Sequence, residues 1–288
     1  MEKRRLGKTE HMSSILIFGS FALFRISQKA ADATLEMALE NGINHIDVSP
    51  LYGDAEKHLG SWFRKNGKKF FLGCKTNERR KTGAWKSLKC SLDTLKVDCF
   101  DLFQLHGVDD VKTLNTVLGP GGALEAVLEA KQQDLVHYIG ITGHNPPLQN
   151  KALQRFDFDT VMFPLNRVHA IHPTDWNDFA PLLQTSRQKD VGVIAIKSVA
   201  KRAWEDHQAR SHPYNTWYEP FDEASEIERS LWYTLSQDIT AAMLPGELQL
   251  WPMIIDAAKR FKPLSKKKQQ EVMSQVAQYQ PLVGPRMD

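Results

Sequence analysis

Cysteine is scarce in this sequence, and the few cysteines are badly spaced for a structural role. Only Cys74, Cys90 and Cys99 occur in 288 residues. Their number is odd and no C-x-x-C pair is present, which argues against both a disulfide framework and a structural zinc site. We therefore expect reduced thiols and a cytoplasmic protein.

Long apolar runs and a strong net charge are missing as well. The first residues, MEKRRLGKTE, have no apolar segment behind their charges that could serve as a signal peptide, and no stretch approaches the length of a membrane span. The formal net charge is only +3, so neither a nucleic acid nor a membrane is expected as a partner. We expect a small-molecule substrate, and a monomer or small homo-oligomer.

Short apolar runs alternate with longer segments of helical periodicity along almost the whole chain. The helical patterns include residues 28–41, closed by Gly42, and residues 124–133. The apolar runs predict eight strands, at residues 14–19, 43–47, 70–75, 99–106, 138–142, 160–165, 191–197 and 239–244.

The number of these units decides between two parallel α/β folds. A doubly wound sheet usually has fewer strands and a glycine-rich first turn, and no G-x-G-x-x-G occurs here. We therefore predict an α/β protein with the (β/α)8 TIM-barrel fold, a single domain over residues 1–288 with a C-terminal helix from residue 265. An aromatic-rich segment at 202–222 predicts a long loop after strand seven, whose aromatic residues either wall a substrate pocket or anchor the loop to the barrel.

Polar residues end three of the predicted strands, at the place where barrel enzymes carry their catalytic groups. These residues are Asp47, Lys75 and His106, and Tyr52 follows the first of them in the loop PLYGD. We therefore expect a carboxylate, an ammonium, an imidazole and a phenol to meet on one rim of the barrel.

Such a set suits a proton donor whose acidity must be raised. A phenol has an ordinary pKa of about 10, too high for efficient proton donation near neutral pH. An ammonium within about 4 Å, at an effective dielectric constant near 20, favours the phenolate by roughly 4 kcal/mol and so predicts a pKa near 7 for Tyr52. Asp47 would keep Lys75 charged, and His106 would orient the reacting oxygen.

Several segments together form a pattern that is specific, although each piece alone is weak. They are RRLGKTE, HIDVSPLYGDAEKHLG, CKT, LFQLHG, YIGITGHN, VGVIAIKSVA and ITAAMLPG. In this order they resemble the aldo-keto reductase superfamily over most of the chain, from its amino terminus through its aspartate-and-tyrosine block, lysine strand and histidine strand to its eighth strand.

The resemblance implies NAD(P)H-dependent reduction of an aldehyde or ketone to an alcohol, on a barrel that binds the dinucleotide without a Rossmann motif. Tyr52 matches the family's general acid, Lys75 and Asp47 the pair that lowers its pKa, and His106 the group that orients the carbonyl. The positions matched to cofactor binding are Gly19, Ser20, Asp47, Thr142, Gly143, His144, Asn166, Lys197, Ser198 and Gly246.

Two positions depart from the family where amide side chains are usual. Gly143 stands in place of an asparagine that holds the nicotinamide carboxamide, so His144 or Asn145 is expected to take over. Met162 stands in place of a glutamine, and Asn166 is the candidate for the missing amide.

Charge is also distributed differently from the family. Lys197 occupies the position of an aromatic residue that stacks on the nicotinamide, where a cation suits reduced cofactor or an anionic substrate. The loop PGELQLWP offers Glu247 where NADPH-preferring members place a cation. Either Lys201 and Arg202 reach the 2′-phosphate or the enzyme uses NADH. On family habit NADP(H) is slightly favoured, with NAD(H) as the alternative.

Two other function classes stay open at this point. His45, Asp47, Lys75, His106 and His144 are residue types of a metal-dependent TIM-barrel hydrolase. However, no H-x-H pair occurs in the first or fifth strand, so no metal site is predicted and His45 is read as a polar filler of the barrel interior. The other alternative is a regulatory protein that binds the cofactor with little turnover.

Overall fold

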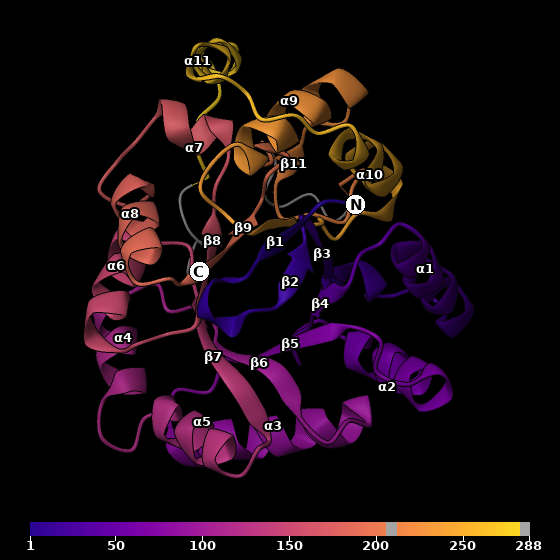
Figure 1. The fold of residues 1–288 in the computed structure, drawn as a ribbon, viewed down its shortest axis with the longest axis vertical. Coiled ribbons are helices and arrows are strands. Elements are labelled where there is room, and N and C mark those ends of the chain that lie inside the picture. The colour runs from indigo at the N-terminus through magenta and orange to yellow at the C-terminus, as the bar shows by residue number, and fades with distance from the viewer. Residues whose placement is uncertain (206–211, 283–288) are drawn as a thin grey trace.

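The computed structural model describes residues 1–205 and 212–282. Within them, eight parallel strands close into a barrel and helices form a ring around it (Figure 1). The order around the barrel is β12, β3, β4, β5, β6, β7, β8 and β9, so β12 closes the barrel by pairing with both β3 and β9. The predicted (β/α)8 barrel is confirmed.

Every predicted barrel strand is present, with ends within two residues of the prediction. The strands are β3 (Leu16–Gly19), β4 (His45–Asp47), β5 (Phe71–Thr76), β6 (Phe100–Leu105), β7 (Val136–Thr142), β8 (Thr160–Pro164), β9 (Gly192–Ile196) and β12 (Ala241–Met243). Their residues are nearly all buried, because helices cover the outer face of a parallel barrel and side chains fill its interior. This double burial explains why continuous apolar runs located the strands.

The helices around the barrel include both segments predicted from periodicity, as α1 and α5. In α1 the side chain of Ser27 caps the first turn by accepting a hydrogen bond from the backbone N–H of Ala30. The helices are α1 (Gln28–Glu40), α2 (Ala55–Asn66), α3 (Lys81–Leu95), α4 (Val111–Leu118), α5 (Ala123–Gln132), α6 (Pro146–Arg155), α7 (Arg167–Ile171), α8 (Ala180–Gln188), α9 (Ala224–Leu235), α10 (Trp251–Lys259) and α11 (Lys266–Ser274). Within residues 1–205 and 212–282, no helix combines the length and apolar character needed to cross a bilayer.

An amino-terminal hairpin, absent from the sequence prediction, lies across one end of the barrel (Figure 1). It pairs β1 (Lys3–Arg5) with β2 (Met12–Ser14). Leu6, just after β1, is fully buried against interior residues such as Ile194 and lies beside Gly192, the first residue of β9. The hairpin therefore closes the end where the strands begin and leaves their carboxyl ends open. Its strands are short and largely polar, so they carry no apolar run that could mark them.

The long segment predicted after the seventh strand contains a small antiparallel hairpin of β10 (Ala200–Arg202) and β11 (Glu219–Pro220). Residues 206–211 of this segment lie outside the described residues. The indole of Trp204 donates a hydrogen bond of 2.9 Å to the carbonyl of Thr216 and so ties the two sides of the described part together.

Candidate active site

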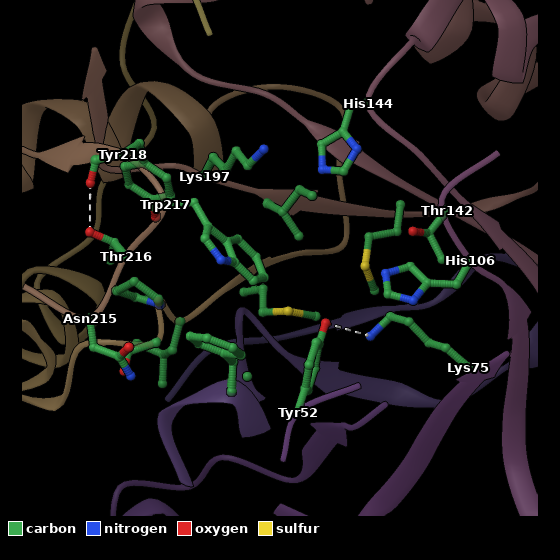
Figure 2. Close-up of a pocket in the computed structure, with 18 residues that line it drawn as sticks. Tyr52, Lys75, His106, Thr142, His144, Lys197, Asn215, Thr216, Trp217 and Tyr218 are labelled. Carbon is green, nitrogen blue, oxygen red and sulfur yellow. Dashed lines mark hydrogen bonds between the residues drawn. The ribbon is translucent and has the colours of Figure 1, made fainter. Parts of the chain in front are cut away.

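A cavity of about 150 Å3 lies at the carboxyl end of the barrel (Figure 2). The last residues of four strands open into it, which is the location that barrel enzymes use for catalysis. Its lining consists of Gly19, Phe21, Tyr52, Lys75, His106, Thr142, His144, Met162, Ile196, Lys197, Asn215, Thr216, Trp217, Tyr218, Met243, Leu244, Pro245 and Gly246.

Strand register brings the predicted catalytic residues together. Asp47 is the last residue of β4 and pairs with Gly73 of β5, which places Lys75 two residues further toward the same rim. His106 directly follows β6. Tyr52 returns to the rim because the following turn closes at Gly53, whose φ is +57° and where a Cβ would lie 2.3 Å from the ring of Phe24.

A chain of polar contacts joins Asp47, Lys75 and Tyr52, of which Figure 2 shows the contact between Lys75 and Tyr52. The ammonium of Lys75 donates to the carboxylate of Asp47 and lies 3.4 Å from the hydroxyl of Tyr52. The second carboxylate oxygen of Asp47 accepts a hydrogen bond of 2.7 Å from the amide of Gln104, whose β6 position is paired with Lys75. Gln104 is a contributor to the site that the sequence analysis missed.

The buried contact with Asp47 keeps Lys75 charged. Although burial acts to lower it, the pKa of Lys75 is raised above its ordinary value by the carboxylate of Asp47 and by Tyr52. Burial raises the pKa of Asp47, and the charge of Lys75 and the hydrogen bonds from Lys75 and Gln104 oppose that shift. Lys75 therefore stays an ammonium beside the phenol.

The prediction that the pKa of Tyr52 falls to about 7 is wrong for the protein without ligand. Burial raises the pKa of Tyr52 above its ordinary value of 10.0, with Lys75 acting against the shift and Asp47 adding to it. The sequence argument counted only the charge of Lys75 toward the phenol. It left out the cost of burying the phenolate, which is the larger effect, and the charge of Asp47 behind the ammonium. Tyr52 therefore keeps its proton at neutral pH.

His106 is a neutral imidazole at the side of the cavity. Burial, followed by the charge of Lys75, lowers the pKa of His106 well below 6.5. Its Nδ1 is buried without a partner among the described residues, and its ring centre lies 6.4 Å from that of Tyr52. The guanidinium of Arg79 holds the backbone around it by donating to the carbonyls of His106 and Gly107, at 2.5 and 2.9 Å. A neutral imidazole can hydrogen-bond a substrate oxygen without adding charge.

Across the cavity from Tyr52 lie His144 and Lys197 (Figure 2). Asp109 holds His144 twice, by accepting from its backbone N–H and by a 3.1 Å contact with its Nδ1. Burial and then the charge of Lys197 lower the pKa of His144. Asp109 is a second residue that the sequence analysis missed, since it lies in a loop with no motif to mark it.

The expected cofactor residues separate into two groups. The cavity lining includes Gly19, Thr142, His144, Lys197 and Gly246. The others are not part of this lining and are Ser20, Asp47, Gly143, Asn166 and Ser198.

Two of these five residues, Ser20 and Asn166, hold neighbouring segments in place by hydrogen bonds. Ser20 donates a hydrogen bond of 2.7 Å to the carbonyl of Asp47. The carbonyl oxygen of the Asn166 side chain accepts from the backbone N–H groups of Val168 and His169, while its amide donates to the carbonyl of Lys197 at 3.0 Å. Asn166 therefore caps α7 and holds the end of β9, with its amide already occupied.

Steric crowding explains why position 143 is a glycine. A Cβ there would lie 2.4 Å from the amide of Gln149 and 2.7 Å from both Asp109 and the carbonyl of Val108. No side chain fits, so the family's asparagine cannot stand here without rearrangement. Gln149 fills the space instead, fully buried, and both polar atoms of its side chain lack partners among the described residues.

The aromatic residues of the long segment have different roles. Trp217 and Tyr218 line the cavity, and Trp217 packs against Phe21 with ring centres 4.7 Å apart. Tyr214 donates to Asp222 at 2.9 Å, and Trp204 ties the segment together as described above. Of these four aromatic residues, two therefore wall the pocket and two make hydrogen bonds within the segment.

A second hollow of about 250 Å3 adjoins the cavity, because both are lined by Asn215 and Gly246. Arg25 and Glu247 are the charged residues of its lining. The two hollows together suit an elongated ligand that begins at Tyr52 and continues outward.

A metal-dependent hydrolase finds no support in the arrangement of these residues. In the part of the chain that the structure describes, no three His, Cys, Asp or Glu side chains are grouped to hold a metal ion. His45 is fully buried and its Nδ1 lies 3.0 Å from the hydroxyl of Ser13, so it fills the barrel interior as expected.

Comparison with known proteins assigns the chain to a family. The sequence model of the Aldo/keto reductase family matches residues 15–279 of this chain. The uncharacterized oxidoreductase YqkF of Bacillus subtilis is 26% identical over 279 residues, covering 85% of this chain and 87% of that protein. The aldo-keto reductase str7 of Strobilurus tenacellus is 26% identical over 229 residues, covering 69% and 61%. A solved aldo-keto reductase of Bacillus halodurans, in its holo form, shares the fold with a TM-score of 0.73 at 21% identity, over 98% of each chain.

Because the family match spans nearly the whole chain and overturns the hydrolase alternative, the protein belongs to the Aldo/keto reductase family and is an NAD(P)H-dependent oxidoreductase.

Proposed function

We propose that this enzyme reduces an aldehyde or ketone to an alcohol with Tyr52 as the general acid. The observation that carries the proposal is the position of the Tyr52 hydroxyl, which lines the cavity 3.4 Å from the ammonium of Lys75. Tyr52 holds its proton at neutral pH, as an acid must before it can give it, and the ammonium of Lys75 beside it can stabilise the phenolate left after the transfer.

The residues present fit a nicotinamide dinucleotide. The cavity and the adjoining hollow form an extended space. Gly19 and Gly246 line it, and a Cβ at these positions would lie 2.4 Å from the carbonyl oxygen of Leu244 and from the ring of Phe21, respectively. We propose that Thr142, His144 and Ser198 hold the nicotinamide end. When bound, the reduced dinucleotide supplies the hydride.

We assign the remaining steps to side chains of the rim. Tyr52 donates its proton to the carbonyl oxygen, and the ammonium of Lys75 stabilises the phenolate that forms. Neutral His106 donates a hydrogen bond to the same oxygen and fixes its direction. Asp47, held by Gln104, keeps Lys75 charged and in place.

For the cofactor, we propose that NADH is accepted at least as well as NADPH. Lys201 and Arg202, which the sequence offered as partners of a 2′-phosphate, both contact Glu219, at 2.5 and 2.7 Å. Glu247 lines the second hollow, and its carboxylate is fixed there by accepting a hydrogen bond of 2.8 Å from the backbone N–H of Asn215. Lys201 and Arg202 are not part of the lining of the second hollow, whose one described cation is Arg25.

A cytoplasmic site of action belongs to the same proposal. Cys74, Cys90 and Cys99 are all free thiols, which supports a reducing compartment.

A titration and one substitution test the proposed function. NADH and NADPH are added separately to the wild type and to Tyr52→Phe, with tryptophan fluorescence reporting the dissociation constants and cofactor absorbance reporting aldehyde reduction. Tyr52→Phe should bind cofactor like the wild type and lose reduction by roughly 100-fold or more. Tyr138→Phe is the matched control, since this tyrosine lies on β7 outside the cavity lining.

Retention of wild-type reduction by Tyr52→Phe would refute the acid assignment. Tight cofactor binding by a wild type that turns over none of a broad aldehyde panel would favour the regulatory alternative instead.

A further inference from the structure

The charges around the cavity are unbalanced. Among its described lining residues, none is an aspartate or a glutamate, and the charged members are Lys75 and Lys197. Lys75 is neutralised by Asp47, which lies behind it. Lys197 is therefore the cation whose charge the site leaves uncompensated.

The backbone of Lys197 is held in an unusual conformation. Its φ is +63°, in the left-handed region that residues other than glycine rarely adopt. The amide of Asn166 donates to its carbonyl at 3.0 Å, and Asn166 is itself tied to the start of α7. The surrounding structure thus imposes this conformation at the point where β9 opens into the cavity.

The ammonium of Lys197 makes no hydrogen bond or ion pair with any residue that the structure describes. Asp109 is the acid that influences it, but this carboxylate already accepts from the backbone N–H of His144 and contacts the ring of the same residue. Figure 2 shows Lys197 and His144 across the cavity from Tyr52.

The wall of the cavity that Lys197 lines is largely apolar. Phe21, Met162, Ile196, Met243 and Leu244 are part of the lining. A charge in such surroundings is costly unless it is paired, and burial accordingly lowers the pKa of Lys197 to about 8. An anionic group on a ligand would supply the missing partner.

We propose that the physiological substrate is a carbonyl compound that also carries a carboxylate, and that Lys197 pairs with this carboxylate while Tyr52 and His106 bind the carbonyl oxygen. This inference rests on the proposed function, since it assigns a substrate class to the same site. Lys197 thereby becomes a specificity-determining residue for the reduction.

The phosphates of the dinucleotide are the other anions that could reach this ammonium. The two sources are separable, because a contact with cofactor changes the cofactor dissociation constant and affects every substrate equally. A contact with the substrate carboxylate changes the ratio between charged and neutral substrates.

The test compares 4-oxobutanoate with butanal, two four-carbon aldehydes that differ in the carboxylate. For each, kcat/KM is measured at pH 7 with saturating cofactor for the wild type, Lys197→Met, Lys197→Arg and Lys86→Met. Cofactor dissociation constants are measured for the same proteins. Lys86 is the control because it is exposed on α3, outside the cavity lining.

The wild type should prefer 4-oxobutanoate, and Lys197→Met should lower the ratio of the two kcat/KM values by roughly 10- to 100-fold. Lys197→Arg should keep most of the preference because it keeps the charge. Lys86→Met should not change the ratio.

An unchanged ratio in a folded Lys197→Met protein would overturn the proposal. So would a weakened cofactor dissociation constant with equal losses for both aldehydes, which would assign Lys197 to the dinucleotide. Failure of the wild type to reduce either aldehyde with cofactor bound would count against the proposed function itself, a result distinct from turnover without preference.

Discussion

The ammonium of Lys75 and the carboxylate of Asp47 form an ion pair in which neither side chain is more than 1% exposed. Such a pair is stable only while both members are present, since loss of one leaves an uncompensated buried charge. The pair also sets the electrostatic environment of the phenol of Tyr52, because the carboxylate offsets the ammonium. Stability and catalysis are therefore linked at this point of the barrel.

Replacing Asp47 by Asn should destabilise the protein as well as slow reduction. We expect a loss of about 3 kcal/mol in the free energy of unfolding, since Lys75 would remain buried without a counter-ion. Urea unfolding followed by tryptophan fluorescence measures this change. The control is Asp54→Asn, which removes an exposed partner of Lys57 and should cost under about 1 kcal/mol. Equal losses of unfolding free energy for the two substitutions would contradict the claim that burial makes the loss of Asp47 costly.

The rate of carbonyl reduction should depend little on pH over the neutral range. Because the pKa of Tyr52 is raised above 10.0, chiefly by burial, its acid form is fully populated below that value. The kcat for reduction should therefore stay level between about pH 7 and 9, whereas alcohol oxidation, which needs the phenolate, should rise with pH across the same range. Steady-state kinetics in both directions gives the two pH profiles. A fall in the rate of reduction with a midpoint near pH 7 would contradict the raised pKa and support the value near 7 that the sequence predicts for Tyr52.

The preference for a carboxylated aldehyde should be lost as the pH rises through about 8. The pKa of Lys197 is lowered to that value by burial, with Asp109 acting to raise it. The ammonium is present below its pKa, so the ratio of kcat/KM for 4-oxobutanoate over butanal should be highest at low pH. The charged and titratable groups that face Lys197 are Asp109, His144 and His169, and burial lowers the pKa of both histidines, that of His169 to about 4.

The substitution Asp109→Asn tests whether Lys197, and not one of the histidines, controls this pH dependence. It removes the carboxylate that raises the pKa of Lys197 and keeps an oxygen for the backbone N–H of His144. The pH at which the preference is lost should therefore move below its wild-type position. A shift to higher pH would show that another group controls the profile.

Removing the charge of Glu247 should improve the relative binding of NADPH. The carboxylate accepts from the backbone N–H groups of Asn215 and Gln249, at 2.8 and 2.9 Å, and glutamine keeps an oxygen for one of these bonds. We expect Glu247→Gln to shift the ratio of NADPH to NADH dissociation constants toward NADPH by roughly fivefold, or about 1 kcal/mol. Glu36→Gln, an exposed position on α1, is the control and should not shift the ratio. No shift with Glu247→Gln would remove this residue from cofactor discrimination.

The barrel and its rim could be predicted because they depend on local patterns. Each strand is buried on both faces, so it appears as an apolar run, and Asp47, Lys75 and His106 stand at or next to the ends of such runs. A parallel barrel brings all strand ends to one rim, so their convergence follows from the topology alone. The amino-terminal hairpin had no such signal, because its short strands are polar.

The electrostatics of the site was decided only by the tertiary structure. The pKa of Tyr52 depends on how far burial and Asp47 outweigh Lys75, and the cation partners of a phosphate depend on whether Glu219 already holds Lys201 and Arg202. Gln104 and Asp109 join the site through contacts between residues distant in the sequence. Residue types and their order determined which chemistry the chain can perform. Distances, burial and the pairing of charges determined the protonation states, and they left Lys197 without a partner among the residues that the structure describes.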